Sequence, residues 1–358
     1  MKLFKRTTLI MIILAIITTL ICNIQSNFYI SSISAIANPP KVGVLLFNFN
    51  DPYISLVKQS LENIEKENPN KVKFYFFDGK DNQAIQNEYV DNFISSNIDL
   101  LLINLVNTNQ STVSDIVSKA NSKNIPLIFF NIQLPIDTKI STNKVFVIAT
   151  NSKVSGIMQG NILVDLWNKN KNAIDKNNDN VLQYIMLQGK TNNETAINRT
   201  IYSISTLNDN GIKTQELALK VCNWEQDCAK NAISSLFLKY GRNIEAIIAN
   251  NDAMAIGAIE ALQAYGYNKG DKTKTIPVVG VDAIPEALEL VSKGFMAGTV
   301  IQYPKDLANA LYSVGLNLVY NRDPLYGTDY KLTKEGTIEI PYYKYTEWYK
   351  LKAKYIKF

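Results

Sequence analysis

The chain of 358 residues contains no histidine. This absence removes the side chain that most often acts as a general base and most often binds transition metals. No predicted strand leads into the glycine-rich turn that cradles phosphate groups, so a phosphate is a poor fit as ligand. The sequence also has no low-complexity tract and no short-period repeat.

The chain also lacks a large excess of charge of either sign. The formal net charge is +5, from 37 Lys and Arg against 32 Asp and Glu. Three of the positive charges, Lys2, Lys5 and Arg6, lie in residues 1–37, which contain no Asp or Glu, and the rest of the chain has a net charge of +2. So small an excess gives no reason to expect nucleic acid as a partner. The length and the hydrophobic fraction of 46% predict a globular protein of two domains.

The N-terminus has the features of a targeting segment. A basic start precedes an apolar run of 14 residues, Leu9 to Cys22, which is shorter than the roughly 20 residues of a membrane span. Ala35-Ile36-Ala37 then provides a small-x-small cleavage site, so residues 1–37 predict a signal peptide. An uncleaved N-terminal anchor is the alternative, because Ala35 lies far from the apolar run. Both readings place the rest of the chain outside the cytoplasmic membrane, whether secreted, periplasmic or at the cell surface.

Beyond residue 40, short apolar runs alternate with segments of helical periodicity. The predicted strands are Val42–Phe47, Val72–Phe77, Leu100–Leu105, Pro126–Phe130, Val181–Leu187, Gln215–Val221, Ala246–Ala249 and Pro277–Val281. The predicted helices are Pro52–Glu67, Gln83–Ser96, Thr112–Asn121, Val154–Asn168, Ala196–Asn210, Asp227–Tyr240 and Ala253–Tyr265. This alternation is typical of the α/β class, and its length predicts two doubly wound parallel sheets.

Residues 175–183 read as the first nine positions of an EF-hand calcium loop. The oxygen donors of this half-motif are Asp175, Asn177, Asp179, the Val181 carbonyl and Gln183. The twelfth-position Glu is missing, since Met186 stands there and Leu182 to Leu187 reads as a strand. A merely polar turn is the alternative to a calcium site.

Polar or aromatic side chains follow nearly every predicted strand. These residues are Asp51, Tyr53, Asn131, Asn193, Arg199, Trp224, Asn251, Asp282 and Gln302. Ligands of open α/β sheets bind beyond the carboxyl ends of the strands. Planar polar groups there can each contact two neighbouring hydroxyls, and aromatic rings can cover the C–H faces of a sugar. The set therefore predicts a neutral, polyhydroxylated ligand.

Several of these residues also have purely structural readings. Asp51, Asn251 and Asp282 each precede a predicted helix and are candidates for its N-cap. Trp224 can be read as a partly buried interface residue, and Asn131 as an ordinary turn residue. The argument for a site depends on the whole set lying at one edge.

Longer stretches of the sequence resemble the periplasmic galactose/glucose-binding proteins, the sugar-capturing subunits of ABC importers of the methyl-galactoside type. The most specific matches are Ile248–Ala258, which contains Asn250-Asn251-Asp252, and Gly280–Leu288, which begins Gly280-Val281-Asp282. Leu207–Thr214 and Ala297–Val300 add to them, and the resemblance covers the chain from Val42 to about Tyr343.

The resemblance implies a type I periplasmic-binding-protein fold, with lobes of residues 38–149 plus 303–338 and 152–300 plus 341–358. Three crossovers near Ala149–Ser152, Val300–Tyr303 and Ile338–Pro341 would act as the hinge. The protein is then a monomer that closes over one monosaccharide and catalyses no reaction. It further implies that Glu245 completes the calcium site, with Asp175, Asn177, Asp179, Val181 and Gln183 as the other ligands.

The same resemblance assigns the predicted strand-end residues to the sugar, with Tyr53 and Trp224 stacking on opposite faces of its ring. Four positions depart from the family pattern, namely Phe47, Asn193, Thr195 and Gln302. A hexopyranose, galactose or glucose, is the expected ligand, but the preference between them stays open.

Two further questions stay open at this stage. Cys222 and Cys228 flank Trp224, and they form a disulfide if the first ends a strand and the second opens a helix, or otherwise remain two thiols. The partner is expected to be an ABC importer, and the alternative is a sensor function towards a membrane histidine kinase or chemoreceptor.

An enzyme acting on a sugar would use Asp51 and Asp282 as an acid/base pair. A DNA-binding repressor of the same fold would need an N-terminal DNA-binding module in place of the signal segment.

Overall fold

The structure is a computed structural model that describes residues 38–134, 144–334 and 336–343. The compact unit discussed below begins at Pro40. The predicted signal peptide, residues 1–37, and residues 344–358 of the predicted second lobe lie outside the described residues. No helix among the described residues combines the length and apolar character needed to cross a membrane.

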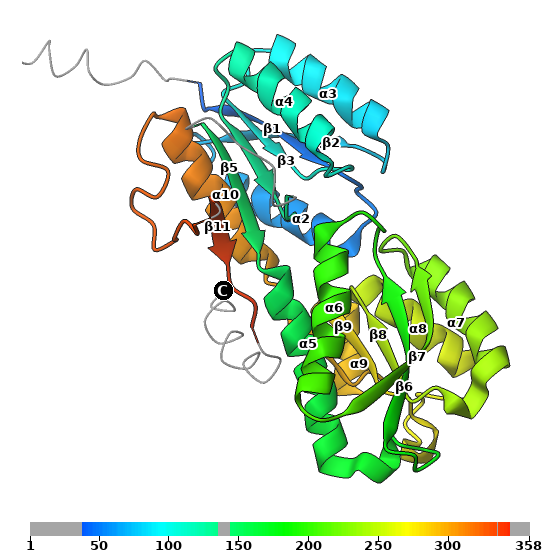
Figure 1. Ribbon diagram of the computed structural model, residues 1–358. Coiled ribbons are helices and arrows are strands. Elements are labelled where there is room, and N and C mark those ends of the chain that lie inside the picture. The colour runs from blue at the N-terminus through cyan, green and yellow to red at the C-terminus, as the bar shows by residue number, and fades with distance from the viewer. Residues whose placement is uncertain (1–37, 135–143, 335, 344–358) are drawn as a thin grey trace, which may run out of the picture. The chain divides into compact units, whose positions relative to one another are not determined.

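Six parallel strands form the first sheet, in the order β11-β5-β4-β3-β1-β2 (Figure 1). The strands are β1 (Lys41–Leu46), β2 (Lys73–Asp78), β3 (Leu100–Ile103), β4 (Leu127–Phe130), β5 (Val145–Thr150) and β11 (Thr337–Ile340). The helices of this part are α2 (Pro52–Glu67), α3 (Gln83–Ser95), α4 (Gln110–Ser122) and α10 (Pro304–Val319). We call this sheet and its helices the N-lobe.

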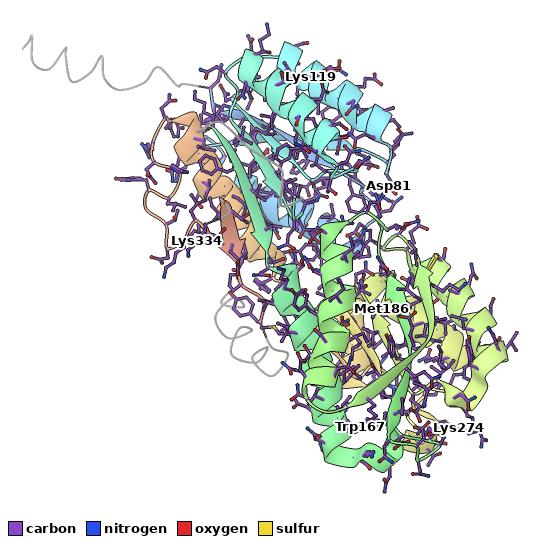
Figure 2. The ribbon with its side chains drawn as sticks, in the orientation of Figure 1. Asp81, Lys119, Trp167, Met186, Lys274 and Lys334 are labelled. Atoms are coloured by element: carbon purple, nitrogen blue, oxygen red, sulfur yellow. A yellow bond between two sulfur atoms is a disulfide. The ribbon has the colours of Figure 1, made fainter. Side chains whose placement is uncertain are left out.

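Five parallel strands form the second sheet, in the order β10-β9-β8-β6-β7. The strands are β6 (Val181–Gln188), β7 (Lys213–Val221), β8 (Ala246–Ala249), β9 (Val278–Asp282) and β10 (Gly298–Ile301). The helices are α5 (Ser152–Asn170), α6 (Glu194–Asp209), α7 (Gln226–Tyr240), α8 (Asp252–Ala264) and α9 (Pro285–Ser292), and the 3-10 turns are η1 (Lys171–Ala173), η2 (Gly241–Asn243) and η3 (Lys272–Lys274). We call this part the C-lobe. Met186 lies inside its sheet, and Trp167 lies near the end of α5 (Figure 2).

Burial explains why these segments form strands. Every residue of β3, β4, β8, β9 and β10 is buried, as expected for parallel strands covered by helices on both faces. The predicted class of two doubly wound parallel sheets is therefore confirmed. Two strands of the first sheet were not predicted, namely β5 and β11, and β5 follows directly after the undescribed residues 135–143. The predicted lobe boundaries themselves stay a prediction.

Short polar side chains start most of the helices. The side-chain oxygens that accept a backbone N–H at a helix N-terminus belong to Asp51, Asn82, Asn109, Asn151, Asn193 and Asn251. The Asn109 cap explains a small error in the predicted start of one helix. We predicted that one helix begins at Thr112, but α4 begins at Gln110 because Asn109 accepts the Thr112 N–H at 2.9 Å.

The chain passes between the two sheets three times, after β5, after β10 and after β11. These passages lie together: Ile301 and Tyr343 exchange two backbone hydrogen bonds, and Thr150 donates to the Tyr342 hydroxyl at 2.7 Å. All three crossovers are therefore joined beside one another, which is the arrangement that a hinge requires.

Candidate functional site

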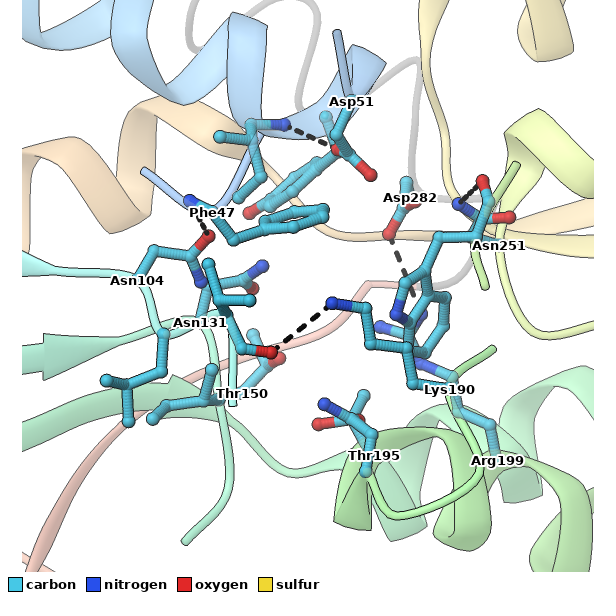
Figure 3. A pocket seen from close by; sticks show the side chains of 17 residues that line it. Phe47, Asp51, Asn104, Asn131, Thr150, Lys190, Thr195, Arg199, Asn251 and Asp282 are labelled. Atoms are coloured by element: carbon cyan, nitrogen blue, oxygen red, sulfur yellow. Dashed lines mark hydrogen bonds and ion pairs between the residues drawn. The ribbon is translucent and has the colours of Figure 1, made fainter. Parts of the chain in front are cut away.

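A cavity that is partly open to solvent is lined by residues of both lobes (Figure 3). Its lining includes eight of the nine predicted contacts: Asp51, Tyr53, Asn131, Asn193, Arg199, Trp224, Asn251 and Asp282. The other lining residues are Phe47, Ile54, Asn104, Leu105, Val106, Ile132, Thr150, Lys190 and Thr195. The carboxyl ends of both sheets thus contribute to one cavity, which is where ligands of open α/β sheets bind.

Asp51 and Asn251 are helix caps that also line the cavity. Asp51 Oδ1 accepts the Ile54 N–H at 2.9 Å, and Asn251 Oδ1 accepts the Met254 N–H at 3.0 Å. The cap therefore occupies one oxygen of each residue, while the second Asp51 oxygen and the Asn251 amide group have further bonding capacity. The Asn251 amide donates to the Trp224 carbonyl at 3.1 Å, which ties this residue to the aromatic side of the cavity.

Asp282 is not a helix cap, because Ile284 occupies the N-cap position of α9. Asp282 ends β9 with a φ of 123°, a conformation that L-residues rarely adopt. The buried carboxyl of Asp252 holds the turn that follows, by accepting the Ile284 N–H at 3.0 Å and the Thr299 hydroxyl at 2.6 Å. Strain of this kind is found where a side chain is held for binding.

Burial changes the acidity of the carboxyls in the cavity. It raises the pKa of Asp51 to about 6 and raises the pKa of Asp282 well above its ordinary value. The nearby Arg199 guanidinium works in the opposite direction on the pKa of both groups. Carboxyl groups that have lost water in this way gain most from hydroxyl groups that bind to them directly.

Arg199 lies at the centre of the polar network. Its four hydrogen-bond acceptors are Ser155 Oγ (from Nε, 3.3 Å), the Asn250 carbonyl (from Nη1, 2.6 Å), Gln302 Oε1 (from Nη2, 3.1 Å) and Tyr342 Oη (from Nη2, 2.9 Å). The guanidinium has five N–H donors, so one N–H on Nη1 is left. Asp282 Oδ1 lies 3.9 Å from this nitrogen. A ligand between Asp282 and Arg199 can therefore accept one hydrogen bond from the arginine.

Gln302 does not line the cavity, in contrast to the other predicted contacts. It is buried behind it, where its amide donates to Asn131 Oδ1 at 2.5 Å and accepts from Arg199. Asn131 belongs to the N-lobe and Arg199 to the C-lobe. In this structure Gln302 thus links one predicted contact from each lobe.

The two predicted stacking residues both line the cavity. Trp224 packs against Gly189, where an added Cβ would lie 2.4 Å from the indole ring, so the close approach requires glycine. The Arg199 guanidinium lies 5.9 Å from the Trp224 ring centroid. Tyr53 is 4% exposed, and its hydroxyl has no hydrogen-bond partner among the described residues. A buried hydroxyl of this kind is available to a ligand.

Cys222 and Cys228 form a disulfide, with 5.3 Å between their Cα atoms. Of the two alternatives, the bridge is the one that the structure contains. The strand β7 ends at Val221 and α7 begins at Gln226, so the chain turns back between the two cysteines. The bridge closes the loop that carries Trp224, in which Asn223 and Trp224 both have positive φ.

Removing this disulfide is expected to weaken ligand binding as well as stability. Closing so short a loop contributes about 2 kcal/mol to the free energy of unfolding, and the reduced loop no longer holds Trp224 in its left-handed conformation. A variant with Cys222→Ser and Cys228→Ser should unfold at lower denaturant concentration and bind its ligand several-fold more weakly. Denaturant unfolding and calorimetric titration check both effects. Unchanged affinity in a destabilised variant would show that the bridge does not position Trp224.

Three polar lining residues, Asn104, Thr150 and Lys190, had no place in the predicted site. Asn104 was read as part of a strand extending to Leu105, but β3 ends at Ile103 and the Asn104 amide donates to the Phe130 carbonyl at 3.0 Å. Thr150 is the last residue of β5, a strand that was not predicted. Lys190 directly follows Gly189, which the sequence analysis noted after a predicted strand. The prediction did not consider the positive charge of Lys190.

The loop 175–183 adopts a compact turn closed by hydrogen bonds to its own carboxylates. Asp175 accepts the N–H groups of Asp179 and Asn180, each at 3.1 Å, and Asp179 Oδ1 accepts the Val181 N–H at 2.8 Å. Asn180, at the position usually taken by glycine, has a φ of 63°. The strand β6 begins at Val181, within this loop, so the loop has no exit helix, as predicted.

Glu245 reaches this loop from the residue before β8. Its two carboxylate oxygens accept the N–H groups of Lys176 and Gln183, which lie 69 and 62 residues away in sequence. Burial raises the pKa of Glu245, and the nearby carboxylates of Asp175 and Asp179 raise it further. In the part of the chain that the structure describes, no three His, Cys, Asp or Glu side chains are grouped so that they could hold a metal ion. The other expected ligands, Asn177, Gln183 and the Val181 carbonyl, belong to none of these types.

Two parallel sheets whose carboxyl ends share a polar cavity, joined by three adjacent crossovers, define a two-lobed small-ligand-binding protein. Residues 42–323 match the model of the periplasmic binding protein domain. The chain is 34% identical over 313 residues to the D-galactose/methyl-galactoside binding periplasmic protein MglB of Haemophilus influenzae, which covers 87% of this chain and 91% of that protein. The chain belongs to the periplasmic binding protein family, and its resemblance to the galactose/glucose-binding proteins is confirmed. This is a family of binding proteins, so the chain is not an enzyme.

Two other similar proteins have lower sequence identity. A putative rhizopine-binding protein of Rhizobium meliloti is 26% identical over 272 residues, which is 75% of this chain and 81% of that protein. A solute-binding protein of Bacillus halodurans, solved with bound myo-inositol, matches with a TM-score of 0.72 at 24% identity, covering 90% of this chain and all of the other. At this identity the structural match supports the fold alone.

Proposed function

We propose that the protein captures a monosaccharide outside the cytoplasmic membrane and delivers it to an ABC importer, with galactose or glucose as the sugar. The observation that carries this proposal is the cavity lined from both lobes by planar polar groups and by two aromatic rings. The relative with 34% identity is named for D-galactose and methyl-galactoside. An extracytoplasmic location agrees with the periplasmic names of the relatives and with the predicted signal peptide.

The cavity suits a neutral sugar because its charges oppose one another. Asp51 and Asp282 supply acceptors, and the remaining Arg199 N–H supplies a donor, so neighbouring hydroxyls can each donate or accept. Asn131 and Asn251 combine both roles, and Trp224 and Tyr53 offer apolar faces. A sugar that contacts both lobes favours their closed arrangement by its differential affinity for that state.

Calorimetric titration with a panel of sugars tests the proposal. Galactose and glucose should bind more tightly than xylose, ribose and myo-inositol, and the sugar should be recovered unchanged after long incubation. Ribose and myo-inositol belong in the panel because other family members carry those ligands in their names. Failure of every monosaccharide to bind would reject the proposed function. Signalling to a membrane kinase is the alternative role after sugar capture, and an uncleaved N-terminus in the native protein would favour it.

We also propose that calcium binds the loop 175–183, with Asp175, Asn177, Asp179, the Val181 carbonyl, Gln183 and Glu245 as ligands. Two observations support this assignment. Gln183 Oε1 is buried and has no hydrogen-bond partner among the described residues, although its amide nitrogen donates to Asp179 at 2.8 Å. Burial and the nearby carboxylates of Asp175 and Asp179 raise the pKa of Glu245, and a cation would relieve this cost of ionising Glu245. The ion would supply a structural clip and no chemistry.

A further inference from the structure

Lys190 is the cationic side chain of the cavity that the prediction passed over. It follows Gly189 at the end of β6 in the C-lobe, and its side chain extends into the cavity lined by Asn131 and Phe47 (Figure 3). The side chain is 22% exposed. A long, flexible ammonium side chain in such a place is either a ligand contact or a link between surfaces.

The partners of Lys190 all belong to the N-lobe. Its ammonium group forms an ion pair with Asp81 and donates to the Val106 carbonyl at 3.3 Å. It also lies 5.2 Å from the centroid of the Phe47 ring. One C-lobe side chain therefore contacts the loops that follow β1, β2 and β3. Among the ion pairs of the described residues, Lys190–Asp81 is the one that joins the two lobes.

The receiving surface of the N-lobe is held in place. Lys80 and Asp81 have φ values of 50° and 52°, and the Asp81 N–H donates to the Phe47 carbonyl at 2.7 Å. The Val106 N–H donates to the side chain of the buried Gln86 at 3.0 Å. The side chain of Asp81, labelled in Figure 2, is therefore carried by a fixed turn. An ammonium that bonds to it fixes the separation of the lobes at this point.

We propose that Lys190 is an affinity determinant of the sugar site that acts by holding the two lobes together. Other polar contacts between the lobes, such as Gln302 with Asn131 and Gln133 with Ser152, involve residues at or next to the crossovers. In addition, the Asn198 amide of α6 donates to Gln133 Oε1 at 3.0 Å. Lys190 instead starts from the end of β6 and forms its contacts without any ligand. It raises the population of the closed state before sugar arrives. Because apparent affinity is the intrinsic affinity multiplied by that population, the pair tightens binding without requiring a contact to the sugar.

The test uses the full chain and the variants Lys190→Met, Asp81→Asn and the double variant. The Lys190–Asp81 ion pair is partly exposed, and the Val106 carbonyl and the Phe47 ring also contact the ammonium group. We therefore expect each single variant to bind D-galactose and D-glucose about three- to tenfold more weakly. The double variant should be no weaker than either single one, because both changes remove the same contact. Raising the ionic strength should weaken binding by the wild type but not by the variants.

A matched control is Lys230→Met, which removes an ion pair to Glu260 within the C-lobe and should leave affinity and its salt dependence unchanged. If Asp81→Asn keeps wild-type affinity while Lys190→Met loses it, Lys190 acts directly on the sugar and the proposal is overturned. Unchanged affinity in both single variants overturns it as well.

The proposal rests on the proposed function, but a second measurement does not need a sugar. Small-angle X-ray scattering of the ligand-free protein should give a larger radius of gyration for both single variants than for the wild type and the Lys230→Met control. Equal radii would contradict the interlobe role even if sugars bind. Failure of all sugars to bind, with different radii, would reject the proposed function and leave the interlobe role standing.

Discussion

Replacing Arg199 by alanine is expected to abolish sugar binding and to lower the free energy of unfolding by about 3–5 kcal/mol. The guanidinium is buried and donates four hydrogen bonds, to acceptors on α5, after β8 and in two of the crossovers. It is also the cation nearest to the buried carboxyl of Asp282. Its removal leaves that carboxyl without this counter-charge, takes the donor from the Gln302 side-chain oxygen, and leaves the Tyr342 hydroxyl with Thr150 as its donor. The loss corresponds to a fall in melting temperature of roughly 10 °C for a chain of this size.

A double variant separates the two effects of Arg199. Arg199→Met combined with Asp282→Asn removes both charges, so it should regain part of the stability while sugar binding stays lost. Asn is chosen because it tolerates the positive φ of residue 282. Arg322→Ala is the control, since that guanidinium lies against the exposed rings of Tyr320 and Tyr326 and its loss should change stability by less than about 0.5 kcal/mol. Wild-type stability in Arg199→Ala would contradict the central place given to this network.

Most helices and strands were predictable because the apolar runs of the inner strands are buried on both faces of a parallel sheet. The helix Pro52–Glu67 and the strand Ala246–Ala249 were predicted with the bounds that the structure gives them. The error of two residues at Gln110 has a local cause, the Asn109 cap. The adjacency of β11 and β5 at one edge of the first sheet had no such local signal, because it depends on pairing between residues almost two hundred positions apart.

Most of the candidate site was also predictable, because parallel strands bring their carboxyl ends to one side of a sheet. That rule brings Asp51, Asn131 and Asn251 to the cavity although a helix cap alone explains two of them. It does not distinguish a residue that lines the cavity from one that lies behind it, as Gln302 does. It also does not say what a flexible cation will pair with, and Lys190 was missed because its partners lie in the other lobe.

Removing calcium is expected to lower stability without changing the choice of sugar. An ion present at a hundredfold excess over its dissociation constant stabilises the native state by about 2.7 kcal/mol, so a chelator should lower the melting temperature by roughly 5–10 °C. The loop 175–183 ends in the first residues of β6, whereas Gly189 and the cavity lie beyond the other end of this strand. The six-residue step from Gln183 to Gly189 separates the two sites by roughly 20 Å, so sugar contacts should keep their geometry. Thermal unfolding and sugar titration, each with and without chelator, measure the two effects.

Glu245→Gln provides the decisive variant, because it removes the carboxylate that joins the loop to the residue before β8. This variant should be less stable than the wild type, and its melting temperature should no longer respond to chelator or to added calcium. Glu286→Gln, an exposed substitution of the same kind at the start of α9, should respond as the wild type does. Since Lys176 and Gln183 donate backbone N–H groups to Glu245, a loss of stability alone does not identify a metal. The loss of the calcium response would identify a metal. A wild-type protein whose melting temperature does not change with chelator would refute the assignment of these ligands.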